Sequence, residues 1–256
     1  MVTGASSGIG YELARQLAER GYDLLLVAQD EEIEQAAVNL RHDGRNRVDA
    51  LRVDLAGYDG VETAWKAIEA TGRAVDVIAL NAGRGIGGEF VGGTPLGDEL
   101  DVVAVNVTST VHLAKRVLPG MVARAEGRVL FTSSIASMMP GTYQAVYNAS
   151  KSFVQSFAEA LRAELKDTGV TVTALMPGPT DTNFFHRAEM DDTRVGAGTK
   201  DDPAVVAEQG IAALFDGKEK VVGGSLKTKV QATASKVMPD AAKAELHRRM
   251  AEPGSA

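Results

Sequence analysis

The chain has 256 residues, of which 45% are hydrophobic and 24% charged, a balance typical of a globular protein with a full core. A net charge of −7, with no cluster of Lys or Arg, argues against nucleic acid as a partner, and a chain without cysteine excludes disulfides and thiolate sites. The four histidines (His42, His112, His186 and His247) have no metal-ligand spacing, so we expect no metal site. No apolar run reaches the ~20 residues that cross a bilayer, and we see no signal-peptide pattern. We therefore expect a cytoplasmic protein with no membrane partner.

The first segment, MVTGASSGIG, has the composition of a turn that holds phosphate. Its glycines allow a tight turn and a close approach of pyrophosphate to backbone N–H groups, and its serines add hydroxyls. Apolar residues at helical spacing from Ile9 onward predict a helix whose N-terminus points at the anion. An ordinary Gly/Ser loop that caps a helix is the alternative interpretation. The turn residues are Gly4, Ser6, Ser7, Gly8 and Gly10.

Only three residues precede this turn, about half of a usual strand. We therefore expect the natural chain to begin upstream of Met1.

Short aliphatic or β-branched runs alternate with amphipathic stretches along the rest of the chain. Near-continuous apolar strands separated by helices predict a parallel sheet with helices on both faces. We expect an α/β fold, a doubly wound Rossmann-type parallel sheet in three layers, that forms a single domain over residues 1–256. Ligands of such sheets bind at the carboxyl ends of the strands. The predicted strands are DLLLVA (23–28), RVDALRV (47–53), VDVIAL (75–80), GRVLFTS (127–133), VTVTAL (170–175) and KVVGG (220–224).

Three other segments have unusual compositions. The glycine-rich run NAGRGIGGEFVGG (81–93) follows a predicted strand, which favours a loop pressed against a ligand over a flexible linker. Residues 177–202 are too long for an ordinary structureless loop, and their two phenylalanines favour a substrate lid over disorder. Residues 225–256 predict a helical tail of two helices separated by Pro239. Leu246 and Met250 lie at helical spacing there, so we expect that helix to pack on the body of the protein or on a partner.

The strongest chemical signal is YNASK, residues 147–151. On a helix, Tyr147 and Lys151 lie on one face about one turn apart. A free phenol has a pKa near 10, too high for efficient proton exchange at neutral pH. A cation about 4 Å away supplies on the order of 4 kcal/mol, about what lowering that pKa to neutrality requires. Tyr143 could be proposed as the acid instead, but the residue four positions after it is Tyr147 and not a cation.

The predicted strand end FTSSIAS (131–137) offers hydroxyl groups at the same edge of the sheet. Ser134 could hydrogen-bond an oxygen whose negative charge develops during a reaction. A serine cluster at a strand end without a chemical role is the alternative.

These motifs, in this order, resemble those of the short-chain dehydrogenase/reductase family. The similarity covers about residues 1–224 and consists of TGASSGIG (3–10), NAG (81–83), the Asn of VAVN (103–106), Ser134, YNASK (147–151) and PGPT (177–180).

The resemblance implies a nicotinamide cofactor and a division of roles among the matching residues. It implies Tyr147 as general acid/base, Lys151 as the cation that lowers the tyrosine pKa and holds the nicotinamide ribose, Ser134 as the group that orients the substrate oxygen, and Asn106 as support for a proton-relay water. The cofactor-binding residues it implies are Gly4, Ser6, Ser7, Gly8, Ile9, Gly10, Gln29, Asp54, Leu55, Asn81, Ala82, Gly83, Tyr147, Lys151, Pro177, Gly178 and Thr180. Among them, residues 81–83 are expected on the adenosine side, Asp54 at the adenine and Thr180 at the nicotinamide amide.

The end of the second predicted strand, VAQD (27–30), departs from the family pattern. An acidic residue there accepts the ribose hydroxyls of NAD, whereas an arginine pairs with the 2′-phosphate of NADP. Ala28 and Gln29 occupy the two positions, so neither discriminator is present, and Asp30 could face either way. We expect NADP or NAD, and favour NADP because Ala28 leaves room for a phosphate.

We expect a homodimer or a homotetramer from one apolar stripe. The helix that begins near Tyr147 carries Phe153, Phe157, Leu161 and Leu165 at helical spacing, which resembles the surface through which relatives dimerise. Burial of this stripe against the sheet is the alternative.

The sequence thus predicts an oxidoreductase that transfers a hydride between NAD(P)(H) and the carbonyl or secondary alcohol of an apolar small molecule. We expect substrate contacts from Met138, Met139, Tyr143, Phe184 and Phe185, while His186 and Arg187 in the lid could reach an anionic substituent. The alternative is a catalytically silent NAD(P)-binding regulator that senses redox state. An epimerase or dehydratase on the same fold is disfavoured by the glycine spacing.

Overall fold

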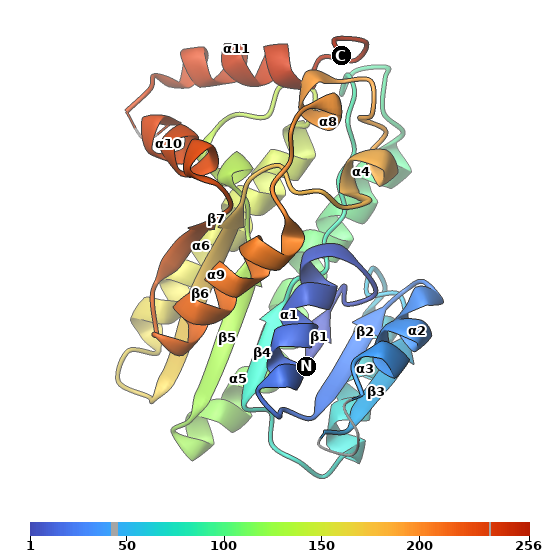
Figure 1. The fold of residues 1–256 in the computed structure, drawn as a ribbon, viewed down its shortest axis with the longest axis vertical. Coiled ribbons are helices and arrows are strands. Elements are labelled where there is room, and N and C mark those ends of the chain that lie inside the picture. Colours follow the sequence, from blue (N-terminus) through green and yellow to red (C-terminus); the bar gives the residue numbers. More distant parts are fainter. Residues whose placement is uncertain (42–45, 236) are drawn as a thin grey trace.

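The computed structural model describes residues 1–41, 46–235 and 237–256, so His42 lies outside the described residues. Within them, seven parallel strands form one sheet in the order β3-β2-β1-β4-β5-β6-β7 (Figure 1). The doubly wound parallel sheet expected from the sequence is confirmed. The strands are β1 (Val2–Thr3), β2 (Leu24–Ala28), β3 (Val48–Arg52), β4 (Val77–Leu80), β5 (Gly127–Thr132), β6 (Val170–Pro177) and β7 (Lys220–Gly223).

Each run predicted as a strand contains one, and the short β1 lies in the interior of the sheet, beside the central strand β4. Val2 pairs with Leu26 of β2 on one side and with Ala79 of β4 on the other. The direction of strand progression reverses between β1 and β4, which makes this position the topological switch point where such sheets bind ligands. The glycine-rich turn that follows β1 lies at this switch point.

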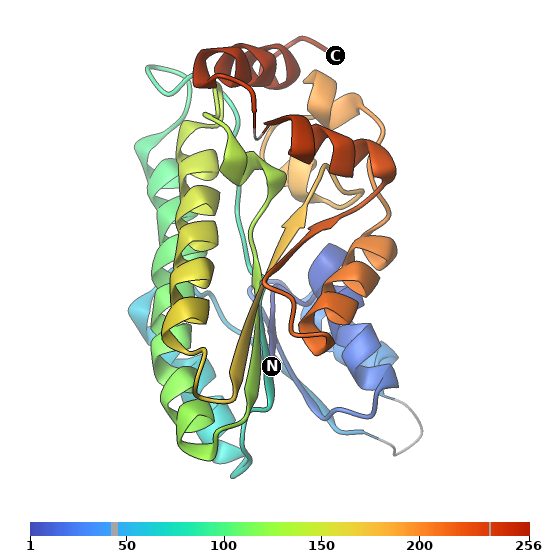
Figure 2. The same cartoon turned by 90° about the vertical axis from the view of Figure 1, so that its left-hand side faces the viewer.

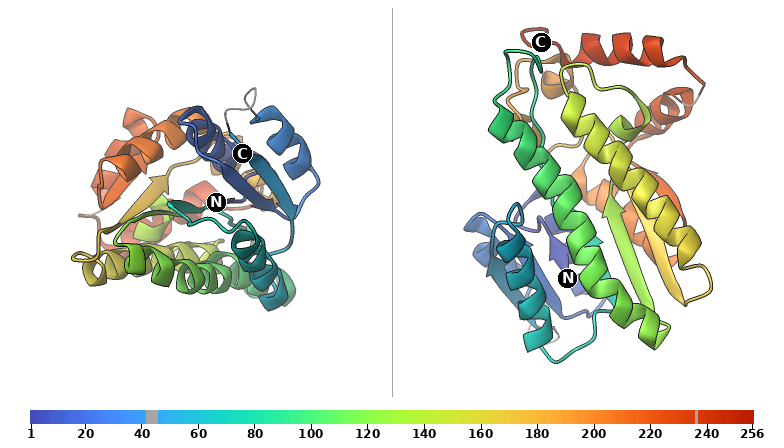
Figure 3. Two further views of the ribbon diagram at one scale, coloured as in Figure 1. Left: turned by 90° about the horizontal axis from the view of Figure 1, so that it is seen from below. Right: turned by 180° about the vertical axis from the view of Figure 1, so that it is seen from behind.

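Helices cover both faces of the sheet, so the fold has three layers (Figures 2 and 3). One face carries α1, α2 and α9, and the other carries α3, α5 and α6. The helices on the two faces are α1 (Gly8–Glu19), α2 (Glu32–Asn39), α9 (Pro203–Phe215), α3 (Tyr58–Ala70), α5 (Ser109–Arg124) and α6 (Ala145–Glu164).

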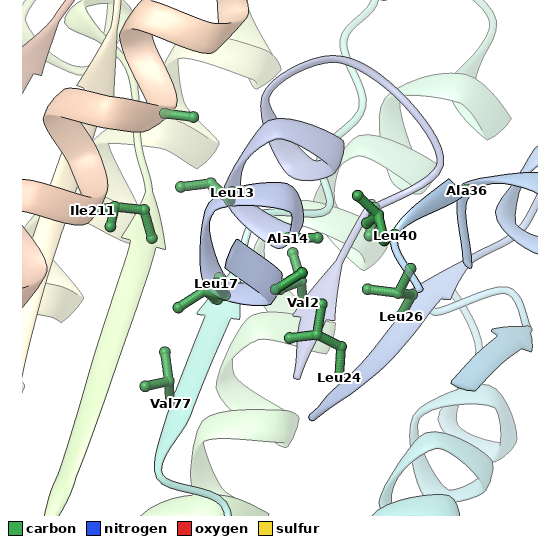
Figure 4. Close-up of a cluster of buried hydrophobic side chains, with 14 of the residues drawn as sticks. Val2, Leu13, Ala14, Leu17, Leu24, Leu26, Ala36, Leu40, Val77 and Ile211 are labelled. Atoms are coloured by element: carbon green, nitrogen blue, oxygen red, sulfur yellow. The ribbon is translucent and has the colours of Figure 1, made fainter. Parts of the chain in front are cut away.

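The helix predicted after the glycine turn is α1, and its apolar spacing places its side chains in the core. Leu13 and Leu17 are fully buried between the sheet and Ile211 of α9 (Figure 4). Burial of each such leucine contributes roughly 1.5–3 kcal/mol relative to exposure. This packing fixes α1 with its N-terminus at the switch point.

Further helices gather at the carboxyl edge of the sheet, above the strand ends in Figure 1. Two belong to the predicted lid and two to the predicted tail, while α4 leads through one π-helical turn into α5. These elements are α7 (Phe184–Arg187), α8 (Arg194–Ala197), α10 (Leu226–Ser235), α11 (Asp240–Ala251), α4 (Leu96–Val103), the π-helix Ala104–Thr108 and the 3₁₀-helix Ile135–Met138. Among the described residues, no helix combines the length and apolar character needed to span a membrane.

The apolar stripe of α6 is partly buried against the sheet and partly exposed at the surface. Phe157, Leu161 and Leu165 pack against the core of their face, whereas Phe153 is 41% exposed. In α11, the residues that turn inward are His247 and Ala251, while the predicted Leu246 and Met250 are only half-buried.

Candidate functional site

A cavity of about 580 Å³ lies at the carboxyl edge of the sheet, over the switch point. Its wall contains most of the residues that the sequence analysis assigned to a site. Asn106, Met138 and Tyr143 are absent from its lining, and the substrate role of the last two stays a prediction. The predicted residues that line the cavity are Gly4, Ser6, Ser7, Gly8, Ile9, Gly10, Gln29, Asp54, Leu55, Asn81, Ala82, Gly83, Ser134, Met139, Tyr147, Lys151, Pro177, Gly178, Thr180, Phe184 and Phe185.

The glycine turn between β1 and α1 forms a cradle that side chains would fill. Gly4 and Gly8 have positive φ angles of 64° and 56°, which L-residues rarely adopt. A Cβ on Gly10 would lie 1.9 Å from the carbonyl oxygen of Gly4. Glycine at these positions leaves backbone N–H groups open at the N-terminus of α1, a favourable place for an anion. The cradle therefore fits the pyrophosphate of a dinucleotide.

Asn81, at the end of β4, ties the central strands together. Its backbone N–H donates to Thr3 Oγ1 at 2.9 Å, its side-chain amide donates to the Thr3 carbonyl at 3.1 Å, and its Oδ1 accepts from Thr132 at 2.9 Å. These bonds hold β1, β4 and β5 in register at the cavity floor. Two residues later, Gly83 lies beside the Lys151 ammonium, since a Cβ there would be 3.1 Å from Nζ. The 81–83 segment therefore runs toward Lys151, and its contact with the adenosine stays a prediction.

Ser134, Tyr147 and Lys151 come together on the wall of the cavity. The hydroxyl groups of Ser134 and Tyr147 share a hydrogen bond. Lys151 is one turn after Tyr147 on α6, with its Nζ 5.9 Å from the centre of the phenol ring, and it donates to the carbonyl of Thr132 at 3.0 Å. Both α6 side chains are buried. A proton donor, a hydroxyl partner and a cation thus face one reaction volume.

The protonation of this trio is governed by burial. Burial raises the pKa of Tyr147 to about 12, and the hydrogen bond from Ser134 acts in the opposite direction. Burial also lowers the pKa of Lys151 to about 8. At neutral pH the phenol therefore holds its proton and the lysine is mostly charged, which are the protonation states of a general acid and its supporting cation. The pKa of the phenol lies above that of a free phenol, which is opposite to the direction that the resemblance implies for the working enzyme. The lowering of the tyrosine pKa by Lys151 needs the ammonium to stay charged while the phenol ionises, and it stays a prediction.

Asn106 lies in the π-helical turn, fully buried, and its side chain is occupied by protein partners. Its Oδ1 accepts from the backbone N–H of Arg84 at 2.8 Å, and its Nδ2 donates to the Arg84 carbonyl at 2.9 Å and to Ser150 Oγ at 2.8 Å. Such π-turns often occur at functional sites. In this structure Asn106 pins the loop after β4 against α6, and the proton-relay role implied by the resemblance stays a prediction.

The opposite end of the cavity lies beyond the carboxyl end of β2. Asp30 faces the glycine turn, where its Oδ2 accepts from Ser6 Oγ at 3.0 Å. Arg187 of the lid reaches the same place, because its Nη2 donates to Ser7 Oγ at 3.2 Å. The sequence left open that Arg187 could reach an anionic substituent of the substrate, and in the structure its side chain lies at this end of the cavity.

The predicted lid is anchored at both ends and closes over the tyrosine. Thr180 and Asp201 form an isolated bridge that joins the two ends of the segment. Between them, the Phe184 ring lies 5.2 Å from the Tyr147 ring, centre to centre. A Cβ on Gly85 would be 2.5 Å from Phe184 Cζ. The glycines after β4 therefore give room to the lid, as well as lining the cavity.

The helical tail supplies cavity residues that the sequence analysis missed. His247 is 5% exposed, and its Nδ1 lies 2.8 Å from the Thr142 carbonyl. The helical spacing of Leu246 and Met250 indicated that α11 packs on the body, but the direction of its inner face required the tertiary structure. The lining residues that the tail supplies are Ser225, Lys227, Thr228, Gln231, His247, Met250 and Ala251, and the lid adds Arg194 and Val195.

Comparisons with known proteins agree with this geometry. The family model described as "short chain dehydrogenase" matches residues 1–193. The protein named "Putative ketoacyl reductase" from Streptomyces coelicolor is 36% identical over 71% of this chain and 70% of its own. The NADP-dependent 3-hydroxy acid dehydrogenase of Salmonella typhi is 30% identical over 84% of this chain and 86% of its own.

Solved structures show the same fold. A short-chain dehydrogenase from Sphingobium yanoikuyae in complex with NADPH has a TM-score of 0.81 and 26% identity, with 92% of this chain and 91% of the other covered. An alcohol dehydrogenase from Thermococcus sibiricus complexed with 5-hydroxy-NADP has a TM-score of 0.75 and 25% identity, with 88% and 95% covered. The family match spans most of the sequence and agrees with the position of the trio and the glycine cradle. The chain therefore belongs to the short-chain dehydrogenase/reductase family of NAD(P)-dependent oxidoreductases.

Proposed function

We propose that this enzyme interconverts a ketone or aldehyde and its alcohol, and that its substrate is an apolar small molecule. The observation that carries the proposal is the buried trio of Ser134, Tyr147 and Lys151 beside the glycine cradle. When bound, the nicotinamide cofactor supplies or accepts the hydride. The residues that would hold it are those of the cradle, the strand ends and the start of the lid.

Tyr147 exchanges the proton on the substrate oxygen. In the reductive direction its phenol, which is protonated at neutral pH, donates to the oxygen as charge develops there. Ser134 orients that oxygen, because its hydroxyl already meets the phenol. Lys151 holds the ribose next to the nicotinamide and keeps a positive charge near the phenolate that forms. Asn106 acts through its hold on Arg84, which keeps Gly83 beside the ammonium.

Residues 177–202 form the substrate lid in this proposal, and the tail of residues 225–256 completes the wall. An apolar substrate is supported by Met139, Phe184 and Met250 in the lining. The lid and tail also bring cations to the wall, but Arg194 donates to the Ser255 carbonyl at 3.1 Å and Lys227 interacts with Asp201. Cations with oxygen partners of their own do not call for an anionic substrate.

We also propose that the enzyme is a homodimer or a larger homo-oligomer with a shared interface on α4 and α6. A shallow apolar groove there has a volume of about 420 Å³. A second copy of the chain is the expected occupant, as the sequence resemblance implies. The groove is lined by Phe90, Val103, Val107, Ala145, Val146, Ala149, Ser150 and Phe153.

An assay of NADPH and NADH oxidation against a panel of apolar ketones tests the catalytic proposal. Tyr147→Phe is expected to lower kcat by about 100-fold or more, because the proton donor is lost. Its dissociation constant for the dinucleotide, measured by calorimetry, should stay close to that of the wild type. Full activity in Tyr147→Phe would contradict the assignment. A wild-type protein that binds the dinucleotide but reduces no ketone would favour the redox-sensing alternative.

A further inference from the structure

A lid arginine lies across the outer end of the glycine cradle. Arg187 Nη1 is 3.9 Å from Asp30 Oδ2, and its Nη2 donates to Ser7 Oγ at 3.2 Å. Ser6 Oγ donates to the same oxygen of Asp30 at 3.0 Å. The other oxygen, Asp30 Oδ1, is buried and has no hydrogen-bond partner in the part of the chain that the structure describes. One guanidinium thus spans a carboxylate and the hydroxyl side of the turn.

This place corresponds to the adenosine ribose of a dinucleotide. In sheets of this type, the group at the carboxyl end of the second strand, beside the glycine turn, reads the ribose 2′ position. Here that strand ends at Ala28 and is followed by Gln29, neither of which carries a positive charge to pair with a phosphate. Asp30 alone would repel a 2′-phosphate. A cation must therefore come from elsewhere if the phosphate is to bind.

Within residues 1–41, 46–235 and 237–256, two arginines lie near this place. Arg52 of β3 donates to the carbonyl of Gln29 at 3.2 Å and lies 3.9 Å from Glu31, and it is absent from the cavity lining. Arg187 is part of that lining, and about half of its side chain is exposed. The geometry favours Arg187, because it donates to Ser7 Oγ and lies beside Asp30, the carboxylate that accepts from Ser6.

We propose that Arg187 is the residue that selects NADP over NAD in this enzyme. When the dinucleotide binds, the guanidinium of Arg187 contacts the 2′-phosphate in place of Asp30. The hydroxyl groups of Ser6 and Ser7 contact the same phosphate. The arginine then lies between the phosphate and Asp30, so the repulsion between the two negative groups is offset. This inference rests on the proposed function and names which dinucleotide that site prefers. It also assigns a specificity role to a residue far in sequence from the second strand.

Calorimetric titration of the full-length protein with NADPH and NADH, at one salt concentration, tests the proposal. For Arg187→Ala, the dissociation constant for NADPH is expected to rise about tenfold or more, because a charge-assisted hydrogen bond is lost. The constant for NADH should change by less than about twofold. Arg187→Lys keeps the positive charge but cannot donate two parallel hydrogen bonds. Its dissociation constant for NADPH should therefore lie between those of the wild type and Arg187→Ala. The NADPH preference of the wild type should weaken as the salt concentration rises.

Asp30→Asn provides an independent second variant. Removal of the carboxylate releases Arg187 and ends the repulsion, so the ratio of NADPH affinity to NADH affinity is expected to rise. A fall in that ratio would contradict the exchange of partners.

Two matched variants complete the experiment. His186→Ala changes the neighbouring residue of α7, whose ring pairs with Asp191 at 2.7 Å outside the cavity, and should leave both constants unchanged. Arg52→Ala should leave the ratio unchanged. The proposal is overturned if Arg187→Ala weakens both dinucleotides equally, if it weakens neither, or if Arg52→Ala alone causes the selective loss. A wild-type protein that binds neither dinucleotide would refute the proposed function instead.

Discussion

The rings of Tyr147 and Phe184 lie 5.2 Å apart, centre to centre, with an angle of 49° between their planes. Tyr147 belongs to the long helix α6, and Phe184 begins the first helix of the lid. The lid therefore covers the phenol directly. Because burial is the largest cause of the raised tyrosine pKa, the position of the lid and the acidity of the phenol are coupled.

Phe184→Ala should weaken catalysis by opening this cover. Loss of the ring removes apolar contact worth roughly 1.5–3 kcal/mol, so we expect kcat/KM for an apolar ketone to fall by about 10- to 100-fold, mainly through a higher KM. Initial rates over a range of ketone concentrations measure both constants. Phe184→Leu, which keeps an apolar side chain, should recover most of the loss. An unchanged KM in Phe184→Ala would mean that the ring does not contact the substrate.

The rate of carbonyl reduction should fall as the pH rises through about 8, the value to which burial lowers the pKa of Lys151. A lowered pKa means that the ammonium loses its proton at a lower pH than a free lysine does. The phenol keeps its proton over this range, since burial raises the pKa of Tyr147 to about 12. The loss above pH 8 therefore belongs to the cation alone. Rates of NADPH oxidation at constant ionic strength measure it.

The control for this pH profile is a measurement of the folded state at each pH. Circular dichroism at each pH should show unchanged helix content, so that loss of rate is not loss of structure. A reductive rate that stayed constant to pH ~9.5 would contradict the assignment to Lys151, whose usual pKa is about 10.4.

The sequence allowed prediction of the fold because periodicity is a local property. Near-continuous apolar runs such as LLLVA at 24–28 are typical of strands that are buried on both faces of a parallel sheet. The Tyr147 and Lys151 pair was predictable for the same reason, since a four-residue spacing fixes a shared helix face. Both inferences needed neighbouring residues alone.

The remaining features of the site depend on contacts between distant segments. Arg187 and Asp30 lie far apart in sequence, and no local pattern indicates that the lid reaches the end of β2. The inner face of α11 was missed for the same reason. Its helical spacing was visible, but the inward position of His247 is seen only in the structure, where its Nδ1 lies 2.8 Å from the Thr142 carbonyl. Tertiary contacts of this kind decide which residues line the wall.

Two glycine-to-alanine changes should have different effects on the free energy of unfolding. In Gly10→Ala the new Cβ would lie 1.9 Å from the Gly4 carbonyl oxygen, so we expect a loss of about 1–3 kcal/mol in the free energy of unfolding and weaker dinucleotide binding. Gly97 is exposed in α4, and a Cβ there meets nothing within 4 Å. Gly97→Ala should therefore be neutral or stabilise by up to ~1 kcal/mol. Urea unfolding measures both. Equal stability of the two variants would contradict a close-packed cradle.

The exposed apolar residues of the groove on α4 and α6 give the last prediction. Phe90, Val103 and Phe153 are 59%, 38% and 41% exposed, an arrangement that favours burial against a second copy. Phe153→Glu places a charge in that contact, so light scattering after size exclusion should show a lower mass than the wild type, whose mass is expected to be a multiple of 26.9 kDa. Val38→Glu makes the same change at a 54% exposed residue of α2 and should leave the mass unaltered. A wild-type chain that runs as a monomer, or an unchanged mass in Phe153→Glu, would remove this surface as the interface.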